Sequence, residues 1–125
     1  MGLISGLLGH SSKTDVSKVQ EEFGPILVDG EEVLAAYRVL RDMVVFTTKR
    51  LILVDKQGVT GTKADYQSIP YQRIVRFSKE SAGLADLEAE LKIWIVGQPQ
   101  PITKTFTRND NVNEVYQLLG RAILQ

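Results

Sequence analysis

Few side chains in this sequence could carry out catalysis. The chain has no Cys, which excludes thiolate nucleophiles, disulfides, zinc fingers and iron–sulfur clusters. Its one His, His10, precedes every predicted strand, so a multi-histidine metal site is excluded as well. Nucleophilic hydrolysis needs a base within reach of a Ser or Thr, and the sequence offers no such base. We therefore predict no catalytic residue, no metal site and no cofactor.

Glu88 and Glu90 are the remaining candidates for acid–base chemistry. They lie two residues apart, on one face of a predicted strand. Lys92 shares that face, however, and a solvated row of surface charges explains all three residues. The sequence also lacks the glycine-rich phosphate-binding patterns of nucleotide-hydrolysing and dinucleotide-binding proteins. The chain is therefore not expected to be an enzyme.

The basic side chains offer a second kind of chemistry, the binding of an anion. Lys49, Arg50 and Lys56 are the candidate contacts, in a basic middle part of a chain whose two flanking parts are acidic. The same pattern also fits ordinary surface charge. It equally fits a head-to-tail contact in which the acidic N-terminal helix of one copy faces the basic strands of the next, and such a contact closes into a ring.

The composition is that of one globular domain. The chain has 125 residues, of which 43% are hydrophobic and 24% charged. Its 15 basic and 15 acidic residues cancel, which argues against nucleic acid as a partner. No apolar run approaches the roughly 18 residues that span a bilayer. The apolar start has no basic residue before it, as a signal peptide would, so a cytoplasmic location is expected.

Residues 1–14 are expected to form a flexible N-terminal arm, ahead of a folded domain over residues 15–125. The arm is apolar because of four aliphatic side chains, Leu3, Ile4, Leu7 and Leu8. It is either a plain tail or a segment that docks on a neighbouring subunit or on a membrane surface.

Helices are expected near both ends of the chain. Residues 16–23 form the first, because Val19 and Phe23 recur at helical spacing and Asp15 or Thr14 can cap the helix start. A Gly-Pro pair then ends it. An amphipathic C-terminal helix is expected at residues 112–123.

Short apolar runs separated by turn residues predict seven strands between the helices. They lie at residues 33–40, 43–48, 51–54, 59–66, 74–79, 88–96 and 102–107. Short connections favour antiparallel pairing. We therefore predict a mainly β fold, a seven-stranded antiparallel barrel or sandwich that is capped by the C-terminal helix.

Trp94 is the most informative single residue. Alternation along residues 88–96 places it on the polar face of its strand, together with Val96. Trp is common among the residues that anchor protein interfaces. Either another part of the same chain covers this side chain, or a second copy does.

The predicted strands at residues 43–48 and 51–54 are apolar on both faces. In a small domain the outer face of a strand is normally polar. A helix or another subunit is therefore expected to cover the outside. The candidate oligomer contacts are Trp94, Val96, Val44 and Phe46.

The order of these elements resembles the pleckstrin-homology-like barrel. Two segments are similar to the signature of bacterial pleckstrin-homology domains, namely Phe46-Thr47-Thr48-Lys49-Arg50-Leu51-Ile52-Leu53-Val54-Asp55 and Ser68-Ile69-Pro70-Tyr71-Gln72-Arg73-Ile74. The resemblance covers residues 15–125 and implies a non-enzymatic domain that forms ring-shaped homo-oligomers. Lipid-binding versions of the fold carry a dense basic motif around the first hairpin, where this chain has only Arg38 and Arg41.

Two functions follow as expectations. The first is a non-enzymatic, homo-oligomeric binding or assembly module, which has copies of itself as partners and another protein as a further partner. The alternative is a peripheral membrane or anionic-ligand binding module, which uses the basic strand region and the apolar arm.

Overall fold

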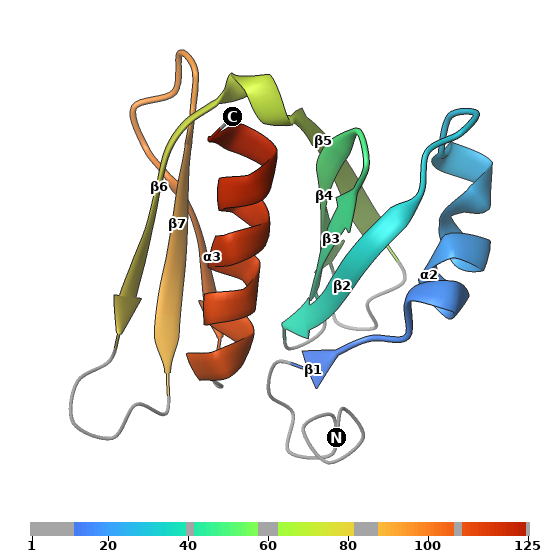
Figure 1. The fold of residues 1–125 in the computed structure, drawn as a ribbon, viewed down its shortest axis with the longest axis horizontal. Coiled ribbons are helices and arrows are strands. Elements are labelled where there is room, and N and C mark those ends of the chain that lie inside the picture. The colour runs from blue at the N-terminus through green and yellow to red at the C-terminus, as the bar shows by residue number, and fades with distance from the viewer. Residues whose placement is uncertain (1–11, 40–41, 58–62, 82–87, 107–108, 125) are drawn as a thin grey trace. The chain divides into compact units, whose positions relative to one another are not determined.

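The computed structural model describes residues 12–39, 42–57, 63–81, 88–106 and 109–124 (Figure 1). The chain divides into two compact units, Met1–Pro70 and Tyr71–Gln125. The first unit holds a five-stranded sheet in the order β1-β2-β3-β4-β5, and the second a three-stranded sheet in the order β6-β7-β8. All neighbouring strands are antiparallel. The predicted mainly β fold with a short N-terminal and a longer C-terminal helix is thus confirmed.

The strands of the first sheet are β1 (Ser12–Lys13), β2 (Val33–Val39), β3 (Asp42–Thr47), β4 (Arg50–Gln57) and β5 (Lys63–Pro70). Those of the second are β6 (Ile74–Ser81), β7 (Ala89–Ile95) and β8 (Ile102–Phe106). The helices are α2 (Val16–Phe23) and α3 (Asn109–Ile123), and the short 3-10 turns are η1 (Gly24–Ile26) and η2 (Tyr71–Arg73).

The seven predicted strands correspond to β2 through β8. The largest shift is in β5, which was expected at residues 59–66 and reaches Pro70 in the structure. The two-residue strand β1 was not predicted, and it lies within the expected arm of residues 1–14. Residues 1–11, with the four aliphatic side chains of the arm and His10, lie outside the described residues.

Helix α2 begins and ends where the sequence predicts. Asp15 is its N-cap, since the Asp15 Oδ1 atom accepts a hydrogen bond from the backbone N–H of Ser17 at 2.9 Å. The chain leaves α2 through η1, which has Pro25 in its first turn.

One face of the first sheet is covered by α2. Val19 and Phe23 are buried there in one apolar cluster with residues of β2, β3 and β4, namely Val33, Ala36, Met43, Val45, Ile52 and Val54. The strands that the sequence showed to be apolar on both faces are therefore covered on this face by a helix of their own chain. No second copy is needed to bury these side chains.

The β3 side chains on the opposite face of the sheet, Val44 and Phe46, are buried as well. Val44 is 0% exposed and Phe46 is 1% exposed. The Phe46 ring packs edge-to-face against Tyr37 of β2, with ring centroids 6.4 Å apart. Both side chains were expected at an oligomer interface, but in this conformation neither has surface to offer to a second copy.

The two edges of the first sheet differ. The outer edge of β2 is closed by β1 and by the backbone N–H of Thr14, which donates to the Ala36 carbonyl at 2.8 Å. The side-chain amide of Gln20 accepts from the Val33 N–H at 2.7 Å and donates to the Glu31 carbonyl at 3.3 Å. On the other side the sheet ends with β5, and no described strand lies beyond it.

In the second unit, α3 packs against β6 and β7. The helix buries Val112, Val115 and Leu119, the stripe that its helical spacing predicted. The rings of Phe77 and Tyr116 meet edge-to-face at 5.1 Å between centroids.

The turn between β7 and β8 also follows the prediction. Gly97 has a φ of 81°, a conformation that favours glycine, and the N–H of Gln98 donates to the Ile95 carbonyl at 3.0 Å.

Replacing Phe23 tests the packing of α2 on the sheet. Phe23→Ala should lower the free energy of unfolding by about 3–5 kcal/mol, because it removes a buried ring and leaves a cavity. Urea unfolding followed by circular dichroism measures the change. Leu34→Ala is the control, since Leu34 is 51% exposed and its loss should cost no more than about 0.5 kcal/mol. A Phe23→Ala change as small as this control would show that α2 does not hold the sheet.

Candidate functional site

A buried ion pair lies at the end of the first sheet where η1 meets the β3–β4 hairpin. Both carboxylate oxygens of Glu31 accept from the guanidinium of Arg50, Oε2 from Nε at 2.8 Å and Oε1 from Nη2 at 3.0 Å. The Glu31 side chain is fully buried, and that of Arg50 is 20% exposed. A two-pronged pair of this kind fixes the direction of both side chains.

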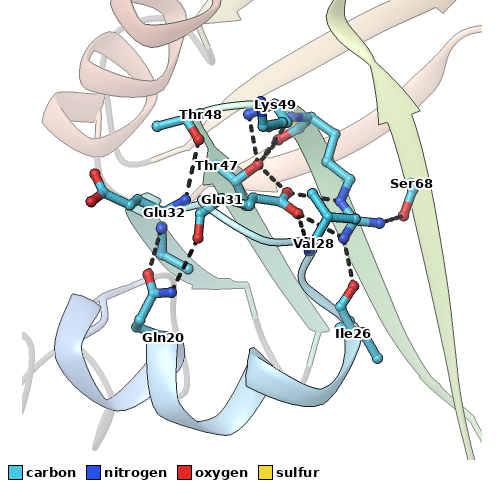
Figure 2. A network of polar contacts seen from close by, with 11 residues as sticks. Gln20, Ile26, Val28, Glu31, Glu32, Thr47, Thr48, Lys49 and Ser68 are labelled. Atoms are coloured by element: carbon cyan, nitrogen blue, oxygen red, sulfur yellow. Dashed lines mark hydrogen bonds and ion pairs between the residues drawn. The ribbon is translucent and has the colours of Figure 1, made fainter.

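Further donors complete the shell of the Glu31 carboxylate. Thr47 Oγ1 lies 2.6 Å from Glu31 Oε2, and the backbone N–H of Val28 donates to Oε1 at 3.0 Å. Thr47 Oγ1 also accepts from the backbone N–H groups of Lys49 and Arg50, each at 3.0 Å, and so shapes the hairpin turn (Figure 2). The carboxylate is therefore hydrogen-bonded on both oxygens, which a buried charge requires.

Arg50 extends the network to two more segments. Its Nη1 atom donates to Ser68 Oγ of β5 at 2.7 Å, and Nη2 donates to the Ile26 carbonyl of η1 at 2.7 Å. The Arg50 side chain of β4 thus connects three segments: η1, Glu31 in the loop before β2, and the edge strand β5.

The network changes the ionisation of both partners. Hydrogen bonds from Arg50 lower the pKa of Glu31 from 4.5 to about 2, against the opposing effect of burial. The same pair raises the pKa of Arg50. Both groups are therefore charged at every physiological pH.

A shallow hollow of about 330 Å³ lies beside this pair. It is lined by Val28, Glu31, Lys49, Arg50, Ser68 and Pro70. Val28 is 56% exposed, and neighbouring Ile26 is 44% exposed. The hollow therefore combines apolar side chains with the paired charges of Glu31 and Arg50, and exposed Lys49 adds one more positive charge.

The structure does not bring the three predicted anion contacts together. Arg50 is neutralised by Glu31, and a guanidinium paired in this way attracts a second anion weakly. Lys49 is an exposed residue of the hairpin turn. Lys56 lies six residues along β4 from Arg50, a separation of about 20 Å in an extended strand. No cluster of positive charge results.

Trp94 lies on the face of β7 that the sequence predicted. It is half-buried, and the Arg76 guanidinium of the paired strand β6 lies 4.2 Å from the centre of its ring. Part of the same chain therefore covers the indole. Next to it Val96 is 49% exposed, and Val75, at an irregularity in the β6–β7 pairing, is 61% exposed. We refer to Val75, Trp94 and Val96 as the Trp94 patch.

Other kinds of site are not seen in the parts of the chain that the structure describes. There, no three His, Cys, Asp or Glu side chains are grouped so that they could hold a metal ion. Within the same residues, no helix is long and apolar enough to cross a membrane.

The residues that sequence reasoning missed are Glu31 and Thr47. Glu31 pairs with a residue 19 positions away, which no local pattern indicates. Thr47 and Arg50 belong to the segment on which the family resemblance rested, and the structure shows that this segment builds a polar turn.

The fold is that of a small, mainly β domain with two antiparallel sheets and a C-terminal helix. The sequence profile of the bacterial PH domain family matches residues 2–123. The uncharacterized protein YjqA of Bacillus subtilis is 52% identical over 121 residues, which make up 96% of this chain and 97% of YjqA. The chain therefore belongs to the bacterial PH domain family.

Solved structures agree with this assignment. A DUF1696 family protein with a pleckstrin-homology domain from Shewanella loihica has a TM-score of 0.82 at 44% identity, covering 91% of this chain and 97% of the other. A pleckstrin homology domain from Shewanella amazonensis has a TM-score of 0.81 at 48% identity, covering 99% of this chain and all of the other (100%). The resemblance noted from the sequence is confirmed.

The low pKa of Glu31 makes stability depend on pH. Above about pH 5 the carboxyl is ionised in the folded and unfolded chain alike, and its stabilisation is fully present. As the pH falls from 4.5 toward 2, the unfolded chain takes up a proton that the folded chain does not. Stability should then fall, by up to about 3 kcal/mol from this group.

Urea unfolding of the wild type and of Glu31→Gln at pH 7, 4 and 2.5 measures this effect. The variant should be less stable at pH 7, because the buried guanidinium loses its counter-charge. The gap between the two proteins should narrow as the pH falls. A gap that stays constant would contradict the assigned pKa.

Proposed function

We propose that this bacterial PH domain is a non-enzymatic assembly module that binds copies of itself through the Trp94 patch. The observation that carries the proposal is the exposure of Val75 and Val96 beside a half-buried Trp94. Trp and Arg are the residue types that most often dominate binding energy at protein interfaces. Here the two residue types lie together, since the Arg76 guanidinium is 4.2 Å from the centre of the Trp94 ring.

The charge pattern supports a head-to-tail arrangement of the copies. Glu21 and Glu22 are exposed on α2, whereas Lys49 and Lys63 are exposed at the two ends of the β4–β5 part of the sheet. A contact between unlike surfaces closes into a ring when the rotation between copies allows it. The ring-shaped homo-oligomers that the sequence resemblance implied would arise in this way.

The alternative, binding of an anionic ligand or a lipid surface, draws less support from the described residues. Arg50 is already neutralised by Glu31, and Lys49 in the hairpin turn lies far from Lys56 near the other end of β4. Self-assembly is therefore the function that we favour.

Trp94→Glu tests the proposal. It should weaken self-association at least about 30-fold, the effect of losing a contact worth about 2 kcal/mol. Light scattering of the wild type at micromolar concentration should give a multiple of the 13.9 kDa chain mass, and the variant should give a smaller mass.

Leu124→Glu is the matched control. Leu124 is also apolar and is 72% exposed, but it lies outside the Trp94 patch, so its replacement should leave the mass unchanged. A wild type that scatters as a single chain at all concentrations would refute the proposed function. Equal loss of mass in both variants would refute the choice of surface.

A further inference from the structure

Some backbone groups of the edge strand β5 have no hydrogen-bond partner among the described residues. Its eight residues pair with β4 in an unbroken register, from Lys63 opposite Gln57 to Pro70 opposite Arg50. In an antiparallel pair, residues alternate between positions that exchange two backbone hydrogen bonds and positions that exchange none. The hydrogen bonds of β4 therefore indicate which backbone groups of β5 point away from β4.

Two hydrogen bonds set this alternation. The backbone N–H of Arg50 donates to Thr47 Oγ1, and that of Lys56 donates to Asp42 Oδ1 at 3.0 Å. Both bonds run toward β3, so Arg50 and Lys56 occupy positions that exchange no hydrogen bonds with β5. Their partners on β5 are Pro70 and Ala64. Because the pattern alternates, Tyr66 and Ser68 also occupy positions that exchange no hydrogen bonds with β4.

The N–H and C=O groups of Ala64, Tyr66 and Ser68 consequently point away from the sheet. All three residues are exposed, Tyr66 to 49%. We call this row of backbone groups the open edge. Exposed rows of this kind are templates for the addition of another strand.

The hollow lies directly beside the open edge. Ser68 and Pro70 belong to both, and Val28 faces them from the segment after η1. Four of the five N–H groups of Arg50 donate to described residues, and the fifth, on Nη1, has no acceptor among them. The site therefore offers backbone pairing, an apolar rim and a donor suited to a carbonyl oxygen.

The chain contains a segment that matches this site. Residues 2–9 carry no charged side chain, so they would leave the Glu31–Arg50 pair intact. In an extended segment, residues four apart share a face, so Leu3 pairs with Leu7 and Ile4 with Leu8. In either register one aliphatic pair faces the hollow.

The geometry favours a neighbouring copy over the same chain. The N-terminal segment enters β1 at the closed edge of the sheet, four strand spacings or about 19 Å from β5. Between the two edges, α2 covers one face, and on the other face Val44 and Phe46 are already buried. Described residues thus block a path across either face, whereas a segment of 11 residues, if extended, would span about 36 Å.

We propose that residues 3–8 of one copy add as a strand to the open edge of β5 in the next copy, with their aliphatic side chains in the hollow. This inference rests on the proposed self-assembly and assigns it a second contact, separate from the Trp94 patch. Because the donor segment and the acceptor edge are different surfaces, the contact is head-to-tail.

A charged side chain in the hollow tests whether the hollow binds the aliphatic side chains of residues 3–8. Val28→Asp in the full chain should weaken self-association at least tenfold, measured as the concentration at which light scattering shows dissociation. Leu34→Asp is the matched control, because Leu34 on β2 is similarly exposed, 51% against 56%. Equal behaviour of the two variants would overturn the proposal.

Cysteine pairing tests the contact itself, and the natural chain has no Cys to interfere. Full-length Ser5→Cys and Tyr66→Cys chains are co-expressed and mildly oxidised, because a Ser5 opposite Tyr66 places Leu3 or Leu7 opposite Ser68 of the hollow. A disulfide-linked pair of the two chains is expected, in higher yield than for Ser5→Cys with Thr103→Cys on the edge strand β8. A yield no higher than that of the control would overturn the proposal.

Two further outcomes identify other occupants. Linkage of Tyr66→Cys chains to each other would show that β5 edges pair with one another. A chain that carries both cysteines tests the remaining case. A disulfide within this chain, without linkage between chains, would show that the segment folds onto the β5 edge of its own chain. If the wild type assembles but one of these two outcomes is found, the strand addition is refuted and the proposed self-assembly stands. A wild type that remains a single chain refutes both the strand addition and the self-assembly.

Discussion

The first unit depends on a buried carboxylate that has no solvent to stabilise it. Glu31 is held by Arg50, Thr47 and the backbone of Val28, and through Arg50 by Ser68 and the Ile26 carbonyl (Figure 2). Removing one partner of such a pair costs several kcal/mol, since the other charge remains buried. The pair therefore fixes the exit from η1 against β5, and the hollow lies beside this fixed contact.

Alternation and helical spacing were enough to predict the mainly β fold. The run of β-branched and aromatic residues identified β2, β3 and β7, and Val19 with Phe23 identified α2. The polar strand β5 was placed too early, because a sequence such as Tyr66-Gln67-Ser68 has no alternation to mark its end. The two-residue β1 carries no periodicity at all, and only pairing with β2 defines it.

The site was harder to predict than the fold, for physical reasons. The sequence does not show whether an arginine is solvated or paired with a carboxylate. Arg50 was therefore interpreted as an anion contact, whereas in the structure its partner is Glu31. Strands that are apolar on both faces show that both faces are covered, but not by what. The structure supplies α2 for one face and buries Val44 and Phe46 on the other, which leaves Trp94 and Val96 as the surface residues of the predicted set.

The closed edge of β2 has a consequence for how such sheets could stack. Unlimited edge-to-edge growth into fibrils requires two bare edges on every molecule. Here Gln20, Thr14 and β1 occupy one of them with hydrogen bonds from the chain itself. The two edges of the first sheet are therefore unequal: the edge at β2 is protected by its own chain, whereas β5 presents a long row of backbone groups that no described strand pairs with.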